Sequence, residues 1–179
     1  MSLYTSHQSK MIGSIDRAVT DLKQVHPLTN SYYAQCLEIF EANSDQRLGL
    51  LGWLKANIVS KMSRDANAIL SVGCGTGAFD EHILGYARAR MDQVTYLGIE
   101  PNEIAAAEFL QTMGSQNSDQ VDVSVLVQKF GEKTFKNTFD LILFVQSIYY
   151  LEDRSDAIDA ALQALKPGGE LVIMIAPDE

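Results

Sequence analysis

Residues 68–77, Ala-Ile-Leu-Ser-Val-Gly-Cys-Gly-Thr-Gly, decide the fold of this chain. Their first half is a short apolar run, which predicts a buried strand, and three glycines follow within five residues. Glycine lets the backbone approach a ligand closely, and a helix that begins after the loop offers unpaired N–H donors. The loop is therefore predicted to hold an anionic group. The alternative is a tight strand-to-helix turn without a ligand.

Downstream of the glycines, the apolar pattern alternates between helical and strand spacing. Further strands are predicted at residues 94–99, 121–127, 139–145 and 170–175, the last after a turn at 166–169. Asn102 is predicted to cap one intervening helix, and Ser155 another that runs to Leu165. Strands that alternate with helices through short loops imply an α/β fold, a doubly wound, mostly parallel sheet with helices on both faces. Ligands bind such sheets at the carboxyl ends of the strands.

Three segments are predicted along the chain. Residues 1–30 are polar and weakly periodic, and they are expected to form an N-terminal arm. Residues 31–66 are expected to form two amphipathic helices that are separated near 43–45, and residues 67–179 are expected to form the α/β core. The predicted apolar positions of the second helix are Leu48, Leu51, Leu54 and Ile58.

Composition excludes several classes of protein. The 179 residues are 46% hydrophobic and 21% charged, which is typical of a packed domain rather than a disordered chain. The net charge of −9 argues against nucleic acid as a partner. We expect a cytoplasmic protein with no membrane partner, because no apolar run is long enough for a span and the N-terminus lacks a secretory pattern. The two cysteines are expected to be free thiols, and no metal site is predicted.

A carboxylate at the end of the second predicted strand indicates which kind of ligand the glycine loop binds. Glu100 lies there, followed by Pro101. A carboxylate at this position can accept hydrogen bonds from the two hydroxyls of a ribose. The glycines alone do not separate a nicotinamide site from other nucleoside sites, because Ala78 also satisfies the loose dinucleotide pattern.

Four motifs together resemble class I S-adenosylmethionine-dependent methyltransferases. They are Ile-Leu-Ser-Val-Gly-Cys-Gly-Thr-Gly (69–77), Gly-Ile-Glu-Pro (98–101), Phe-Asp-Leu-Ile (139–142) and Leu-Lys-Pro-Gly-Gly-Glu-Leu (165–171). The resemblance implies a Rossmann-like fold with S-adenosylmethionine as cofactor. The residues expected to hold the cofactor are Gly73, Cys74, Gly75, Gly77, Glu100, Pro101 and Val145.

A narrower resemblance is to histamine N-methyltransferase-like enzymes. It rests on residues 33–46, on Ser-Val-Gly at 71–73 and on Val-Gln-Ser-Ile-Tyr-Tyr at 145–150. It implies that the helices within 31–66 border an acceptor pocket. The residues expected on the acceptor side are Tyr33, Asp45, Gln146 and Tyr150. Where that family has a substrate-binding glutamate this chain has Asp45-Gln46, and Ala105 stands where the family has a glutamine.

The predicted function is methyl transfer from S-adenosylmethionine to a small molecule, at an amine nitrogen. One alternative is a non-catalytic methyltransferase-like subunit, because Ser71 stands where a carboxylate usually does; another is an oxidoreductase, which rests on the dinucleotide pattern alone. The family continues beyond the fifth strand with a helix and two more strands. We therefore expect a fragment truncated there, or a homo-oligomer or second chain that covers the edge of the last strand.

Overall fold

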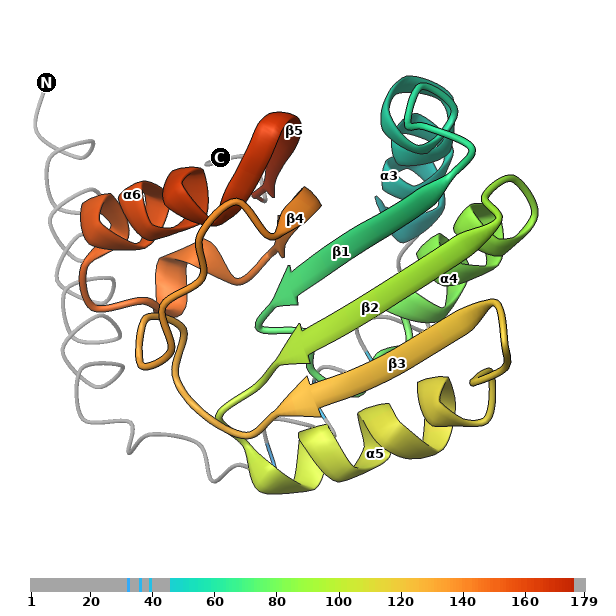
Figure 1. Ribbon diagram of the computed structural model, residues 1–179. Helices are drawn as coiled ribbons and strands as arrows, with labels where there is room; N and C mark the ends of the chain where they lie inside the picture. Colours follow the sequence, from blue (N-terminus) through green and yellow to red (C-terminus); the bar gives the residue numbers. More distant parts are fainter. Residues whose placement is uncertain (1–31, 33–35, 37–38, 40–45, 176–179) are drawn as a thin grey trace, which may run out of the picture. The chain divides into compact units, whose positions relative to one another are not determined.

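The computed structural model describes residues 46–175 and three positions upstream, Tyr32, Cys36 and Ile39 (Figure 1). The chain divides into two units, Met1–Asn43 and Ser44–Glu179, and the fold described here is that of the second. The whole of the predicted arm and most of the first predicted helix lie outside the described residues. No helix in the described part of the chain is long and apolar enough to cross a membrane.

One parallel sheet of five strands forms the centre of the second unit, in the order β3-β2-β1-β4-β5. Its strands are β1 (Ala66–Val72), β2 (Gln93–Ile99), β3 (Val121–Leu126), β4 (Phe139–Val145) and β5 (Leu165–Met174). The chain moves outward from β1 to β3 and then returns to the other side of β1. This reversal makes the carboxyl end of β1 the switch point, where a doubly wound sheet binds ligands.

Helices cover both faces of the sheet, as predicted (Figure 1). They are α3 (Gln46–Leu54), which continues into the π-helical turn η1 (Lys55–Val59), α4 (Asp80–Arg88), α5 (Glu103–Gly114), the 3₁₀ turn η2 (Ile148–Tyr150) and α6 (Arg154–Ala164). One face packs against α3, η1, α4 and α5, and the other packs against α6 and the connection from β3 to β4. Both faces of the sheet are therefore apolar, which explains the near-continuous hydrophobic sequence of β4.

Three leucines in the helices lie on the solvent side, and one of them, Leu48, was predicted to be on the apolar face of its helix. Leu48 is 72% exposed, Leu110 is 46% exposed and Leu162 is 54% exposed. The helices turn other residues inward, and in α5 the buried positions Ala106, Phe109 and Met113 follow three- and four-residue steps. The prediction for Leu48 was wrong because the three- and four-residue spacing of apolar residues does not by itself show which face of a helix packs against the sheet.

Three predicted boundaries also need correction. The N-cap of α6 is Asp153 rather than Ser155, because the Asp153 carboxylate accepts a hydrogen bond from the N–H of Asp156 at 3.0 Å. The third strand ends at Leu126, one residue earlier than predicted. The fifth begins at Leu165, not at residue 170.

The early start of β5 has a clear geometric cause. Leu165 pairs with Phe139, and the register then shifts before Glu170 pairs with Leu141. The additional residues of β5 include Gly168, whose φ of +83° is a left-handed conformation that favours glycine. The predicted turn at 166–169 is thus an irregularity within β5, because the residues before and after it both pair with β4.

Candidate cofactor and acceptor site

The glycine loop follows β1 and folds onto the end of β2. The N–H of Gly73 donates to the carbonyl of Ile99 at 2.8 Å, which joins the carboxyl ends of the two strands. Gly73, Gly75 and Gly77 have φ values of +68°, +56° and +81°, so each has a conformation that a residue with a Cβ rarely adopts. The three glycines are therefore required by the backbone itself.

The surroundings of the three glycines differ. A Cβ at Gly73 would lie 2.6 Å from the Cβ of Ser147, and one at Gly77 would lie 2.9 Å from the Phe109 ring. The absence of a side chain at these two positions lets the loop pack closely against Ser147 and Phe109. A Cβ at Gly75 would meet nothing within 4 Å. Gly75 therefore borders open space, as expected of a backbone segment that a ligand approaches.

Glu100 is held beside this open space by backbone donors. One carboxylate oxygen accepts the N–H of Gly75 at 3.0 Å, and the other accepts the N–H of Asn102 at 2.9 Å. Asn102 also caps α5, as predicted, with its side chain accepting from the N–H groups of Ile104 and Ala105. Each carboxylate oxygen has a second lone pair, so Glu100 can accept two further hydrogen bonds. An oriented carboxylate beside an open glycine is compatible with the ribose of a nucleoside cofactor, and the role of Glu100 there stays a prediction.

A buried polar cluster consists of Ser71 on β1, Tyr96 on β2 and Asp80 at the start of α4. The sequence analysis did not predict it. Asp80 is 3% exposed, and its carboxylate accepts the hydroxyl of the fully buried Tyr96 at 2.7 Å. Burial raises the pKa of Asp80 above its ordinary value, and hydrogen bonds from Ser71 and Tyr96 partly oppose that rise. Asp80 thus places a carboxyl group next to Ser71, the position where the family usually has one.

Cys74 lies in the glycine loop with its side chain buried. Its sulfur is 2.7 Å from the position that a Cβ on Gly98 would occupy, so the thiol packs against β2. Burial is the largest cause of a raised pKa for Cys74, followed by the nearby carboxylates of Asp80 and Glu100. An uncharged, enclosed thiol suits packing rather than nucleophilic chemistry.

The segment after β4 forms the other wall of the switch point. Val145 ends the strand and is half-buried, and the N–H of Gln146 donates to the carbonyl of Met174 at 2.8 Å. Gln146 has a φ of +51°, an uncommon conformation for a residue with a side chain and one that often marks functional sites. The hydroxyl of Ser147 donates to the carbonyl of Val72 at 2.6 Å and joins this segment to β1.

The structure places most of the predicted site residues at one edge of the sheet. The predicted cofactor residues lie on the loops after β1 and β2 or at the end of β4, and Pro101 is exposed beside Glu100. On the acceptor side, Tyr150 is 65% exposed and its ring lies 4.8 Å from that of Tyr149. Tyr33 and Asp45 lie outside the described residues, so their predicted roles stay predictions.

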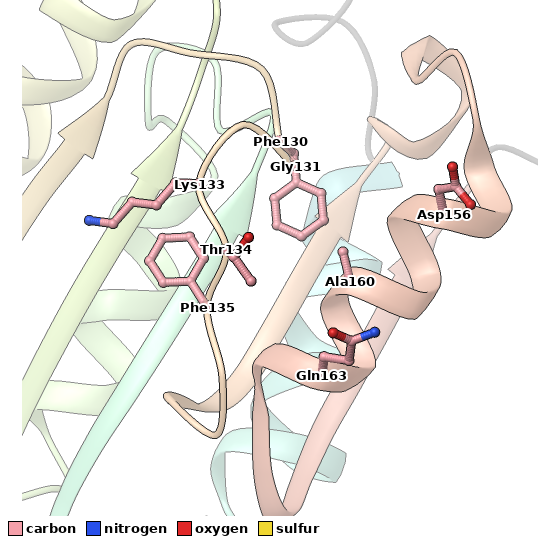
Figure 2. A pocket seen from close by; sticks show the side chains of 8 residues that line it. All are labelled: Phe130, Gly131, Lys133, Thr134, Phe135, Asp156, Ala160 and Gln163. Atoms are coloured by element: carbon pink, nitrogen blue, oxygen red, sulfur yellow. The ribbon is translucent and has the colours of Figure 1, made fainter.

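A separate cavity of about 200 Å³ lies between α6 and the connection from β3 to β4 (Figure 2). It is lined by Phe130, Gly131, Lys133, Thr134, Phe135, Asp156, Ala160 and Gln163. None of the predicted site residues lines this cavity. It is therefore distinct from the edge where the glycine loop, Glu100 and Val145 lie.

Comparison with known proteins agrees with this geometry. The sequence model of a methyltransferase domain family matches residues 70–171. The chain belongs to this family, and its sheet and glycine loop are those of the class I S-adenosylmethionine-dependent methyltransferases. S-adenosylmethionine is the family's cofactor, and the open backbone at Gly75 together with the oriented Glu100 carboxylate fits it.

Three relatives show the range of proteins that this chain resembles. It is 26% identical over 121 residues to norajmaline N-methyltransferase of Rauvolfia serpentina, covering 66% of this chain and 39% of that protein. The crystal structure of the [4+2]-cyclase SpnF is 28% identical, with a TM-score of 0.55 and coverage of 70% and 43%. A Thermotoga maritima methyltransferase described as a possible histamine N-methyltransferase is 21% identical, with a TM-score of 0.57 and coverage of 80% and 57%. The chain thus spans less than two thirds of each relative.

Proposed function

We propose that this protein transfers a methyl group from S-adenosylmethionine to a small molecule at an amine nitrogen. The observation that carries the proposal is the Glu100 carboxylate, hydrogen-bonded to the N–H of Gly75 beside an open backbone segment. Membership in the methyltransferase family supports the reaction. The similarity to norajmaline N-methyltransferase supports nitrogen as the atom that is methylated.

The chain's own residues mainly position the reactants. When bound, S-adenosylmethionine supplies a methyl group that the positive charge of its sulfonium already activates. Glu100 would accept the ribose hydroxyls, while the backbone at Gly73, Gly75 and Val145 would border the rest of the cofactor. Holding an acceptor nitrogen within about 3 to 3.5 Å of the methyl carbon supplies much of the acceleration in such a displacement.

The acceptor must present an unprotonated amine, so hydrogen-bond acceptors near it would orient its N–H groups or take a proton through water. We propose this role for Gln146, which directly follows the carboxyl end of β4 and has a left-handed backbone conformation. Tyr150, Tyr33 and Asp45 are proposed to border the same acceptor. Gln146→Ala should lower kcat for the true acceptor while the Kd for S-adenosylhomocysteine stays nearly unchanged, because the cofactor contacts lie elsewhere.

The experiment is an acceptor screen with the purified chain and S-adenosylmethionine. Imidazole amines, other biogenic amines and hydroxylated compounds are compared by formation of S-adenosylhomocysteine and by the mass of the methylated product. Turnover of an amine, reduced by Gln146→Ala and unaffected by Gln163→Ala on the exposed surface of α6, supports the proposal. Turnover of hydroxylated compounds alone contradicts the assignment to nitrogen.

A non-methylating role is the second candidate, because Ser71 replaces the usual carboxylate and because SpnF, a cyclase, has a similar fold. Binding of S-adenosylhomocysteine by calorimetry without transfer to any acceptor in the screen would favour it. Asp80 argues the other way, since it returns a carboxyl group to the neighbourhood of Ser71. Thermal stabilisation by NAD but not by S-adenosylhomocysteine would instead support an oxidoreductase.

We also propose that a second copy or another chain pairs with the outer edge of β5. Among the described residues β5 pairs with β4 alone, and Ile173 and Ile175 are 38% and 61% exposed. Unpaired backbone and apolar side chains on an edge strand favour pairing with another chain. Light scattering on the purified chain should detect a dimer or larger species. A monomer with full methyl-transfer activity would contradict this proposal.

A further inference from the structure

The cavity between α6 and the connection from β3 to β4 has no part in the proposed methyl transfer (Figure 2). No residue of the glycine loop lines it, and neither Glu100 nor Gln146 does. Its volume is about 200 Å³, and an apolar cavity of about 150 Å³ is enough for a benzene ring. The cavity therefore has room for one aromatic ring with a short chain, but not for a whole nucleoside cofactor.

Two phenyl rings form the apolar part of the cavity wall, and a buried aromatic side chain of β4 holds each of them. The Phe130 ring meets that of Phe144 edge to face, with 5.6 Å between the ring centroids. The Phe135 ring contacts that of Phe139 in a similar way at 5.1 Å. Because Phe139 and Phe144 are themselves buried, the wall is ordered before any ligand binds, which lowers the entropy cost of binding.

The charge that the cavity offers to a ligand is negative. Asp156 on α6 contributes a carboxylate, which has no hydrogen-bond or ion-pair partner in the part of the chain that the structure describes. The Nζ of Lys133 lies over the Phe135 ring, 5.2 Å from its centroid, and Figure 2 shows the Lys133 side chain extending away from α6. The hydroxyl of Thr134 adds a further hydrogen-bond acceptor. A small cation with an apolar body complements these groups.

We propose that this cavity binds an arylalkyl ammonium ion, with its ring against Phe130 and its ammonium group at Asp156. The ring would lose contact with water, and the ammonium would make a charge-assisted hydrogen bond to the carboxylate. Ala160 lies on α6 across from Phe130, and its short side chain leaves the space for the ring (Figure 2). The ion is then a further ligand, which binds apart from both the cofactor and the methyl acceptor.

Nuclear magnetic resonance on the full, isotope-labelled chain tests this proposal with two probes of the same shape. Phenethylamine carries the positive charge, and phenethyl alcohol is its neutral counterpart. The amine should shift the amide signals of Gly131, Thr134 and Ala160, and it should bind there at least about fivefold more tightly than the alcohol. The signals of Gly75 and Gln146 report separately on the proposed cofactor and acceptor site, so binding at the two places is distinguished.

Two variants of α6 with the same change of charge separate the cavity from the general acidity of the chain. Asp156→Asn should bind the amine and the alcohol almost equally. Asp159→Asn lies at an exposed position that does not line the cavity, and it should retain the preference for the amine. Ala160→Leu fills the cavity with a side chain that favours a helix, and it should weaken both probes at least about tenfold.

The proposal is overturned if the amine shifts none of the cavity signals, or shifts those of Gly75 and Gln146 alone. Equal binding of the two probes by the unaltered chain would also overturn it, as would an unchanged preference in Asp156→Asn or full binding in Ala160→Leu. The test needs neither S-adenosylmethionine nor turnover. A failed acceptor screen therefore leaves this inference standing, and an empty cavity leaves the proposed methyl transfer standing.

Discussion

Glu100 is the residue on which the cofactor site depends most directly, because both of its oxygens are oriented by backbone N–H groups. Glu100→Ala should weaken S-adenosylhomocysteine binding by about 1.5 to 3 kcal/mol, the range expected for loss of charge-assisted hydrogen bonds. Calorimetry at neutral pH measures this change. Glu108→Ala, at an exposed position of α5, is the control and should leave affinity unaltered. Unchanged affinity in Glu100→Ala would contradict its role at the ribose.

Asp80 should give the protein a characteristic dependence of stability on pH. Its pKa is raised in the folded state, so the carboxyl group contributes stability below its unfolded pKa of about 3.9 and loses it as pH rises through the higher folded value. Asp80→Asn removes this loss and can still accept from Tyr96. Relative to the unaltered protein, its free energy of unfolding should therefore rise as the pH increases above about 4.

Urea unfolding at several pH values provides the measurement, and Asp80→Ala is the companion variant. Alanine leaves the buried hydroxyl of Tyr96 without an acceptor, which should cost about 1 to 3 kcal/mol. A parallel pH profile for Asp80→Asn and the unaltered protein would show that the buried carboxyl does not titrate as proposed.

The two cysteines should differ in reactivity, because the thiolate is the reactive form and Cys74 is buried with a raised pKa. Cys36 is exposed. In the folded protein, iodoacetamide should label Cys74 at least about tenfold more slowly than Cys36. Peptide mass spectrometry after timed labelling tests this expectation, with denatured protein as the control in which both react. Rapid labelling of Cys74 in the folded state would place its thiol in contact with solvent.

At the scale of a structural element, the glycines of the loop have different roles: Gly73 is needed for packing and Gly75 is proposed to be needed for binding. Gly73→Ala combines a left-handed φ with a Cβ only 2.6 Å from that of Ser147, whereas Gly75→Ala has the strained φ without a clash. Gly75→Ala should cost about 1 kcal/mol of stability and Gly73→Ala clearly more. Thermal unfolding compares them.

The less destabilised of these two variants, Gly75→Ala, should nevertheless lose affinity for the cofactor. The Cβ of Gly75→Ala projects into the open space beside Glu100, so this variant should remain folded and yet bind S-adenosylhomocysteine at least about tenfold more weakly. Calorimetry at a temperature where both variants are folded measures it. Normal affinity in Gly75→Ala would mean that the cofactor does not approach the loop at this position.

The elements also show where local patterns are sufficient and where they are not. The strand that enters the glycine loop and the N-cap at Asn102 were predicted correctly, because both depend on neighbours along the chain. The start of β5 was not, because Leu165 becomes part of a strand only by pairing with Phe139. A Pro-Gly-Gly sequence resembles a turn whether or not a partner strand closes the backbone on both sides of it.

For the molecule as a whole, the sequence by itself determined the α/β class and the position of the glycine loop and of Glu100 after the first and second strands. Period-two and period-3.6 patterns, glycine spacing and the acid after the second strand are local properties, and the alternation of strands and helices allows few topologies. The tertiary structure alone decided which contacts form between distant residues. Tyr96 donates to Asp80, Ser147 donates to the carbonyl of Val72, and the buried Nε2 of Gln128 has no hydrogen-bond partner among the described residues. Such contacts depend on how elements from separate parts of the chain pack together, and no sequence pattern records that packing.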